Sequence, residues 1–338
     1  MGAGRPSVAD RRPNILFVMA DDHDRNRPFL AMVHHKAPHR SWEPAKRHVT
    51  LYDDTTIPEP PTLRDDYVGR STAAVEARMR LWSLSETDLK GLVPPGLTED
   101  EELVWRYQRY IKDYLRCVTA LDENVTRLLD ALDDEGLADD TAVVYTSDQG
   151  FFLGDHGWYD KRFMYEESLR MPFLVRFPRE VTAGTSSAAI VLNVDFAQTF
   201  LDLAGVTPTR PMQGRSLRPI LRGEVPADWR TSMYYRYWMH ADSSHRVWAH
   251  RGVRTDRHKL IHYYSEPLNQ PGAWDEPHPE EWELFDLAAD PFELRSLHDD
   301  PAHAGVLADL RAELDRLSDE VGDVAPDADR RARRKGTS

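Results

Sequence analysis

Two short polar runs, each directly after an apolar segment, carry the side chains best suited to chemistry in this sequence. Asp21 and Asp22 follow the first apolar run, and Asp148 and Gln149 follow a later one. All four offer oxygen donors, which suit a hard cation such as calcium or magnesium. Adjacent carboxylates repel each other unless a cation or base lies between them. Either pair alone also fits an ordinary turn after a strand, so it is the combination of the two pairs that indicates a cation site.

Three apolar segments predict buried strands that bring these polar runs together. Residues 14–20, 28–33 and 141–146 are continuous apolar runs, the pattern of strands that are covered on both faces in parallel sheets. The second run leads into residues 34–39, which contain three histidines and one lysine. Ligands of open α/β sheets bind beyond the carboxyl ends of the strands. We therefore expect one site at that edge of a mostly parallel sheet.

Residues 98–132 predict one long amphipathic helix. Thr98 and Glu101 have the spacing of a capping box, and Gly136 ends the pattern before the strand at 141–146. Cys117 lies on the apolar stripe, which favours a core role over a reactive thiol. The stripe consists of Leu103, Tyr107, Tyr110, Ile111, Tyr114, Cys117, Val118, Leu121, Val125, Leu128 and Leu132.

The C-terminal part of the chain has a different pattern. Residues 189–194 predict a further strand and 196–203 a short helix. After about residue 229, aromatic β-rich segments at 233–238, 246–254 and 259–264 predict a small antiparallel sheet, and 301–320 predict a last helix. We expect a division into a flexible arm (1–12), a main domain (13–228), a smaller α+β subdomain (229–322) and a disordered basic tail (323–338).

The composition excludes several classes of protein. The chain has 43 Lys+Arg and 57 Asp+Glu, a formal net charge of −14, which disfavours nucleic-acid and membrane partners. Cys117 is the single cysteine, so this chain alone forms no disulfide and no cysteine-ligated zinc site. The first apolar run is too short for a signal-peptide core or a membrane span, and Arg11-Arg12 lacks the hydrophobic region of a twin-arginine signal. These features predict a cytoplasmic chain; they do not predict its oligomeric state.

The connection between the first two predicted strands is unusually short. If residues 14–20 and 28–33 are parallel neighbours, only residues 21–28 join them. A parallel crossover needs about a dozen residues or more. The sequence therefore predicts that a crossover segment is missing here.

Several long motifs resemble those of type I sulfatases, in their glycan-directed branch. They are RPNILFVMADD (12–22), HKAPHRSWEP (35–44), SDQGFFLGDHGWYDK (147–161), MYEESLRMP (164–172) and WELFD (282–286). The resemblance extends from residue 12 to about 320. It implies an α/β fold, an alkaline phosphatase-like sandwich whose mostly parallel sheet is flanked by helices, with a smaller C-terminal α+β subdomain that contains an antiparallel sheet.

The resemblance implies roles for individual residues. Asp21, Asp22, Asp148 and Gln149 would hold a divalent cation, usually Ca²⁺ and less often Mg²⁺. The ligand implied is a sulfate ester, either a small molecule or a glycan.

Four further residues of these motifs receive roles toward the sulfate group. His39 would contact the sulfate and act as an acid toward the leaving oxygen, and Lys161 would place a cation on a sulfate oxygen. A metal and fixed cations stabilise the charge that sulfate ester cleavage spreads over the sulfate oxygens. Lys36 and His156 are further candidates for the substrate pocket, although a single His or Lys in a loop is more often simply solvated.

One motif of type I sulfatases is absent. These enzymes carry Cys/Ser-x-Pro-x-Arg, whose first residue is oxidised to formylglycine, the nucleophile. Cys117 begins the segment CVTAL, and no serine has proline two and arginine four residues later. In the family this motif lies between the two predicted strands that are joined here by so few residues. The resemblance and the short connection therefore both predict a truncated main domain.

Three functional hypotheses follow. The first is a sulfuric ester hydrolase acting on sulfated glycans or aryl sulfates through a divalent metal, with impaired turnover because the nucleophile is missing. The second is a phosphomonoesterase or phosphodiesterase of the same superfamily. The third is a non-catalytic protein that binds a metal or an anionic glycan. Preference for a sulfate over a phosphate ester separates the first from the second, and turnover separates the first from the third.

Overall fold

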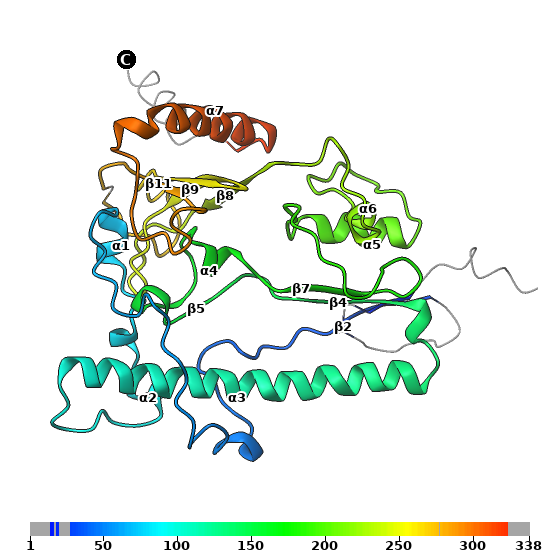
Figure 1. The fold of residues 1–338 in the computed structure, drawn as a ribbon, viewed down its shortest axis with the longest axis horizontal. Helices are drawn as coiled ribbons and strands as arrows, with labels where there is room; N and C mark the ends of the chain where they lie inside the picture. Colours follow the sequence, from blue (N-terminus) through cyan, green and yellow to red (C-terminus); the bar gives the residue numbers. More distant parts are fainter. Residues whose placement is uncertain (1–13, 17, 20–27, 277, 324–338) are drawn as a thin grey trace, which may run out of the picture. The chain divides into compact units, whose positions relative to one another are not determined.

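The computed structural model describes residues 14–16, 18–19, 28–276 and 278–323 of the chain. It is a mixed α/β structure with two compact units (Figure 1). The first unit comprises the described residues within 1–53, 112–148 and 172–229. The second comprises those within 54–111, 149–171 and 230–338. The C-terminal sheet thus forms one unit with two earlier stretches of the chain.

A five-stranded sheet is the centre of the first unit. Its strands, in spatial order, are β2 (Val18–Met19), β3 (Leu30–Met32), β1 (Asn14–Leu16), β4 (Thr141–Thr146) and β7 (Phe173–Arg176). The pairs β2/β3, β3/β1 and β1/β4 are parallel, and β7 is antiparallel to β4. The predicted mostly parallel sheet is therefore confirmed.

The first two predicted strands are indeed parallel neighbours. Ile15 pairs with Leu30 and Leu16 with Ala31, while β2 pairs with the other side of β3. Residues 20–27, which lead toward β3, lie outside the described residues. The missing crossover segment therefore stays a prediction.

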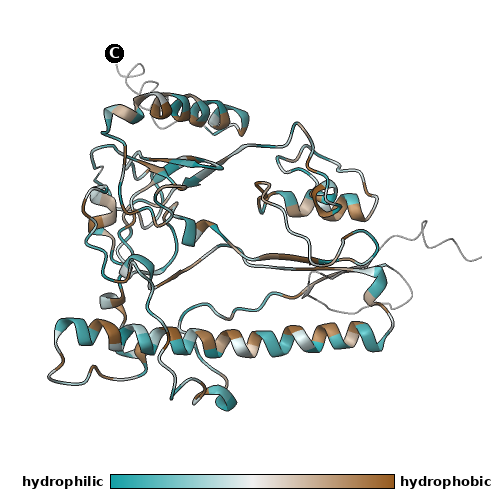
Figure 2. Ribbon diagram, viewed as in Figure 1, coloured by the Kyte–Doolittle hydropathy of each residue, from teal (hydrophilic) through white to brown (hydrophobic). Residues whose placement is uncertain are grey.

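The long helix is confirmed as α3 (Glu99–Asp134). Its capping box forms as predicted: the backbone N–H of Thr98 donates to Glu101 Oε2 at 2.8 Å, and the N–H of Glu101 donates to Thr98 Oγ1 at 3.3 Å. Apolar and polar residues alternate along the helix (Figure 2). Its buried residues include Leu103, Tyr107, Tyr110, Ile111, Cys117 and Leu132.

The first unit also contains α5 (Asp195–Leu203) and α6 (Arg218–Leu221). The predicted helix at 196–203 is thus confirmed. Leu203 of α5 packs in a buried cluster with Ala142 of β4 and with Phe177, which fixes the helix on the sheet.

The predicted strand at 189–194 is wrong. These residues form turns and irregular structure, and their backbone groups bond to side chains instead of a neighbouring strand. The indole N–H of Trp229 donates to the carbonyl of Ile190 at 2.9 Å, and the N–H of Leu192 donates to Asp195 Oδ2 at 2.8 Å. The apolar side chains that predicted the strand pack on the cluster around Trp229.

A four-stranded antiparallel sheet is the main element of the second unit. Its order is β11 (Glu281–Asp286), β10 (His258–Tyr263), β9 (His250–Thr255) and β8 (Ser232–Tyr237). The predicted antiparallel sheet is confirmed, and β11 adds a fourth strand to it. The predicted last helix is α7 (Ala304–Glu320), which begins after a 3₁₀ turn at Pro301–His303. Its Leu310, Leu314 and Leu317 cover Val253, Leu260 and Leu284 of the sheet.

Short elements complete the second unit. They are α1 (Thr72–Glu76), α2 (Glu86–Leu89), β5 (Phe152–Leu153), β6 (Tyr159–Asp160) and α4 (Glu166–Leu169). Buried aromatic rings pack between them: Trp158 stacks on Phe163 at 4.8 Å and on Tyr67 at 5.4 Å between ring centroids. Within the described residues, no helix combines the length and the apolar character that crossing a bilayer would require.

Candidate functional site

The four predicted metal ligands are only partly described. Asp21 and Asp22 lie outside the described residues. Asp148 is exposed and directly follows β4, as predicted, and Gln149 beside it is half-buried. Among the described residues, no group of three or more His, Cys, Asp or Glu side chains is arranged to hold a metal ion.

The surroundings of Asp148 are compatible with a cation. Its carboxylate accepts one hydrogen bond, from Ser147 Oγ at 3.4 Å. In the described part of the chain it forms no ion pair, so most of its oxygen lone pairs are open. Oxygen donors of this kind fit a hard divalent cation. The donors present at Asp148 and Gln149 therefore fit the predicted metal, and the contribution of the other two ligands stays a prediction.

His39 and Lys36 lie on the exposed segment between β3 and the 3₁₀ turn at Lys46–His48. The Nδ1 atom of His39 lies 3.0 Å from the carbonyl oxygen of Arg40. Because a carbonyl only accepts, Nδ1 carries a proton and Nε2 is the atom left to face a ligand. Both side chains are accessible, and their predicted roles toward sulfate are untested by this geometry.

Lys161 directly follows β6 in the second unit and is half-buried. Its ammonium lies 5.8 Å from the centre of the Phe151 ring and forms no ion pair within 4.0 Å with a carboxylate of the described residues, although its charge helps to lower the pKa of the Asp160 carboxyl. Its neighbours Asp160 and Arg162 have φ values of 74° and 107°, a region that residues with a side chain rarely adopt. The surrounding structure must therefore hold this short segment in place.

The turn before Lys161 depends on two glycines. Gly154 has φ 99° and Gly157 φ 66°. A Cβ atom at Gly154 would lie 2.7 Å from Cε2 of Tyr107, and one at Gly157 would lie 3.0 Å from the carbonyl oxygen of Leu63. The motif Gly-Asp-His-Gly thus combines the left-handed backbone with close packing.

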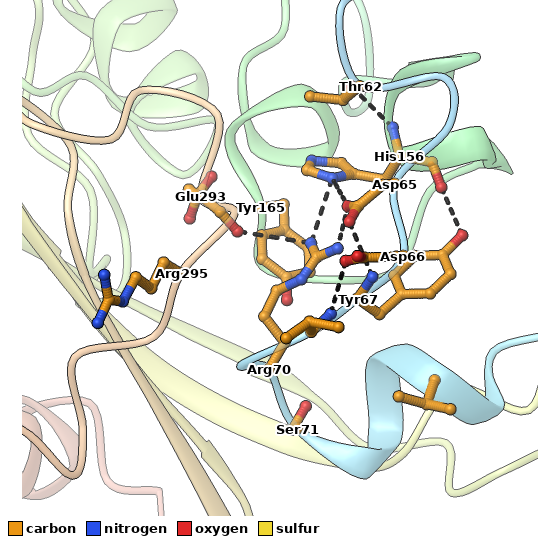
Figure 3. A network of polar contacts seen from close by, with 12 residues as sticks. Thr62, Asp65, Asp66, Tyr67, Arg70, Ser71, His156, Tyr165, Glu293 and Arg295 are labelled. Carbon is orange, nitrogen blue, oxygen red and sulfur yellow. Dashed lines mark hydrogen bonds and ion pairs between the residues drawn. The ribbon is translucent and has the colours of Figure 1, made fainter.

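His156, between these glycines, is fully buried, and Figure 3 shows its ring beside the carboxylate of Asp65. Its Nδ1 lies 2.7 Å from Asp65 Oδ2, and its backbone N–H donates to Thr62 Oγ1 at 2.9 Å. Its carbonyl accepts the hydroxyl proton of Tyr67 at 2.6 Å. These contacts fix the turn that leads to Lys161, and the predicted contact of His156 with substrate stays a prediction.

Arg70 supplies the charge that balances Asp65. Its guanidinium pairs with Asp65 Oδ2 and lies over the rings of Tyr67, Trp158 and Tyr165 at 5.1, 5.8 and 5.7 Å from their centres. The Arg70 side chain has no exposed surface. A buried cation of this kind is stable only with a carboxylate and aromatic faces around it.

The pKa values of His156 and of the carboxyl groups around it are shifted in different directions. Burial would raise the pKa of the Asp65 carboxyl, but the hydrogen bond with His156 and the charge of Arg70 together lower it. Burial lowers the pKa of His156, with the Asp65 hydrogen bond opposing this. Burial also raises the pKa of Glu167 to about 7, and its Oε2 lies 3.8 Å from Nε2 of His156. Asp65 is thus ionised at neutral pH, and His156 is neutral.

The chain matches the family model described as Sulfatase over residues 7–206, which is more than half of its length. It also matches the model described as N-sulphoglucosamine sulphohydrolase, C-terminal, over residues 154–320. The chain belongs to the sulfatase family. The resemblance inferred from its motifs, with its alkaline phosphatase-like α/β fold, is thereby confirmed.

Comparisons of this sulfatase-family chain with individual proteins add detail to the two family models. The chain is 39% identical over 363 residues to an N-acetylglucosamine-6-O-sulfatase of Bacteroides thetaiotaomicron, covering 95% of this chain and 62% of the relative. A solved structure of a protein in complex with its substrate, D-glucosamine-2-N,6-O-disulfate, has a TM-score of 0.84 at 40% identity, covering 90% of this chain and 68% of the other. A phosphonate monoester hydrolase from Silicibacter pomeroyi has a TM-score of 0.68 at 26% identity, covering 88% of this chain and 56% of the other.

The chain spans less than two thirds of the length of the N-acetylglucosamine-6-O-sulfatase that it matches. The family and fold are therefore established for this chain, whereas its activity and substrate belong to the proposal below.

Sequence reasoning missed much of the network around His156. Asp65 and Arg70 lie in a polar, proline-rich stretch without periodicity, and nothing in that stretch marks them. Ser168 and Glu167 were within reach, because they belong to the sulfatase-like motif MYEESLRMP. The motif indicates the family, but by itself it assigns no role to these two side chains.

Proposed function

We propose that this sulfatase-family chain binds the sulfate ester of a 6-sulfated amino sugar and that its hydrolytic turnover is impaired. The observation that carries the proposal is the 39% identity to an N-acetylglucosamine-6-O-sulfatase across 95% of this chain. The fold match to a complex with D-glucosamine-2-N,6-O-disulfate supports the same class of ligand.

Two cations and one acid would recognise the ester. Lys161 pairs with no described carboxylate, so its charge is available to a sulfate oxygen. His39 and Lys36 are exposed, so a ligand can reach them. Asp21, Asp22, Asp148 and Gln149 would hold a divalent cation, calcium before magnesium, which when bound supplies positive charge to the sulfate group.

Impaired turnover follows from the missing nucleophile. The chain contains no Cys/Ser-x-Pro-x-Arg segment. Its alignment with the N-acetylglucosamine-6-O-sulfatase runs over 363 residues although it uses only 95% of a 338-residue chain, so the relative contains residues within the matched span that have no counterpart here. This supports the predicted deletion. Without a nucleophile, the expected behaviour is binding with little or no release of sulfate.

The test compares ligands by titration calorimetry on the full chain. N-acetylglucosamine 6-sulfate is expected to bind in the presence of calcium, and more weakly after EDTA treatment. N-acetylglucosamine 6-phosphate is the competing ligand, because the similarity to a phosphonate monoester hydrolase keeps phosphorus esters in the comparison. Tighter binding of the phosphate, or no binding of either sugar, contradicts the proposal.

Two variants and a turnover assay complete the test. Lys161→Ala should weaken binding of the sulfated sugar about tenfold or more, because a charge-assisted contact is lost. Lys112→Ala is the matched control, because Lys112 is also half-buried but donates to the carbonyl of Asp53. Sulfate release by the wild-type chain at the rate of an intact sulfatase would refute the impaired turnover.

A further inference from the structure

The short helix α4 is anchored by buried charges (Figure 1). The carboxylate of Glu166, its first residue, lies 2.9 Å from the Lys259 ammonium and 3.1 Å from the Arg254 guanidinium. The backbone N–H of Glu166 donates to Glu293 Oε2 at 2.7 Å. Lys259 and Glu293 are 0% and 1% exposed. Displacing α4 would leave these buried charges unpaired, which is strongly unfavourable, so the ion pairs hold α4 in place within the second unit.

Ser168 of α4 contacts two separate segments of the chain. Its carbonyl oxygen accepts the N–H of Gly150 at 2.9 Å. Its hydroxyl oxygen accepts the N–H of Arg162 at 3.0 Å. Ser168 itself is 5% exposed, so water does not replace these bonds easily. One buried residue therefore joins the turn after Gln149 to the segment that carries Lys161.

Both segments need such support. A Cβ atom at Gly150 would lie 2.1 Å from the carbonyl oxygen of Glu167 and 2.9 Å from that of Arg170, so the turn packs directly on the α4 backbone. Arg162 has φ 107°, which is unfavourable for a residue with a side chain. The hydrogen bond to Ser168 Oγ is made by the N–H of this strained residue, directly after Lys161.

We infer that Ser168 is a positioning residue that holds Gln149 and Lys161 in fixed positions on α4. The proposed metal ligand, Gln149, and the proposed sulfate-binding cation, Lys161, then face the same bound sulfate ester. The inference rests on the proposed function for the roles of Gln149 and Lys161. The contacts of Ser168 stand on geometry alone. Its hydroxyl acts through the backbone of Arg162 and does not itself touch the sulfate.

The test uses Ser168→Ala and a matched control, Ser296→Ala, in the full chain. Each substitution removes a serine oxygen that accepts a backbone N–H: that of Arg162 for Ser168, and that of Leu284, at 3.2 Å, for Ser296. Ser296 lies in the same unit, outside α4 and the two segments that Ser168 joins. The readouts are amide hydrogen exchange across residues 149–171 and the affinity for N-acetylglucosamine 6-sulfate with calcium present. Ser168→Thr, which keeps the hydroxyl, is the rescue variant.

In Ser168→Ala we expect exchange at the Arg162 amide to become about tenfold faster and affinity for the sugar to fall about five- to tenfold. Ser296→Ala should change neither, and Ser168→Thr should restore the slow exchange. Unchanged exchange at Arg162 overturns the inference, as does faster exchange with unchanged affinity.

A failure of the proposed function gives a different result. In that case the wild-type chain does not bind the sulfated sugar, and Lys161→Ala does not change the measured binding. The exchange measurement needs no ligand, so it still decides whether Ser168 holds the Lys161 segment.

Discussion

His156 and Asp65, 91 residues apart in the sequence, are joined by a 2.7 Å contact between Nδ1 and Oδ2. Because a carboxylate only accepts, Nδ1 of His156 carries the proton and Nε2 is left without one in the neutral ring. Arg70 Nη1 also lies 3.2 Å from Nδ1, but two donors cannot bond each other; Nη1 donates to the carbonyl of Glu293 at 3.4 Å, and Nη2 donates to Asp65 Oδ2 (Figure 3). The pair fixes both the tautomer of the ring and the turn before Lys161.

Asp65→Asn should destabilise the chain by about 3–5 kcal/mol, because it leaves the buried Arg70 guanidinium without the carboxylate that pairs with it. Denaturant unfolding followed by circular dichroism measures the loss. The control is Asp66→Asn: Asp66 is exposed, and among the described residues its carboxylate accepts the N–H of Val68, at 2.9 Å. A similar small loss in both variants would show that the buried pair adds nothing.

Glu167→Gln should stabilise the chain above pH 7. Burial raises the pKa of Glu167 to about 7, so the folded state keeps a proton that the unfolded state loses from about pH 4.5 upward. The wild-type chain therefore loses stability between about pH 4.5 and 7, by up to about 3 kcal/mol, and the variant does not. Unfolding free energies at pH 4, 6 and 8 measure this. An unchanged pH dependence in the variant is the contradicting result, with the exposed Glu86→Gln as the reference.

Titration of His156 should give the folding stability the opposite pH dependence to that given by Glu167. Burial lowers the pKa of His156, so below about pH 6.5 the unfolded chain takes up a proton that the folded chain resists. Stability is thus lost as the pH falls below this value. His156→Gln should flatten that acidic slope while lowering the stability at pH 7, since the contact with Asp65 is weakened. Equal slopes for both proteins between pH 6.5 and 5 would argue against a buried neutral ring.

Gly154→Ala should cost about 1–3 kcal/mol more than Gly184→Ala. Both glycines have positive φ, 99° and 76°, so both substitutions strain the backbone. Only at Gly154 would the new Cβ meet Tyr107, at 2.7 Å, whereas nothing lies within 4 Å at Gly184. Thermal unfolding of the two variants separates steric overlap from backbone strain, and equal losses would mean that the Tyr107 ring moves away freely.

Calcium should stabilise the folded chain if Asp148 is a ligand. At about 100 times its dissociation constant, a ligand that binds only the folded state adds about 2.7 kcal/mol. We expect calcium to raise the unfolding temperature of the wild-type chain and of Asp139→Ala, which alters an exposed aspartate after α3. Asp148→Ala should lose the shift, and a retained shift would place the calcium elsewhere.

The sequence by itself determined the elements whose signals are local. The stripe from Leu103 to Leu132 and the capping box at Thr98 involve residues three or four apart, so the helix follows from its own segment. The run at 141–146 likewise determined β4. The ordered motifs of the sequence also determined the family, because they are long enough to be specific.

Tertiary structure decided the partners that lie far apart in the chain. Residues 189–194 have a strand pattern, but the indole of Trp229 takes the carbonyl of Ile190, and the segment forms no strand. The sequence gives no indication that His156 is buried against Asp65, 91 residues away, and its predicted contact with substrate stays a prediction. Ser168 belongs to a sulfatase-like motif, but the motif does not predict its contacts, since these come from the two segments that meet at α4. Local periodicity carries no information on such contacts, because a buried polar group bonds to whichever partner the topology brings within reach.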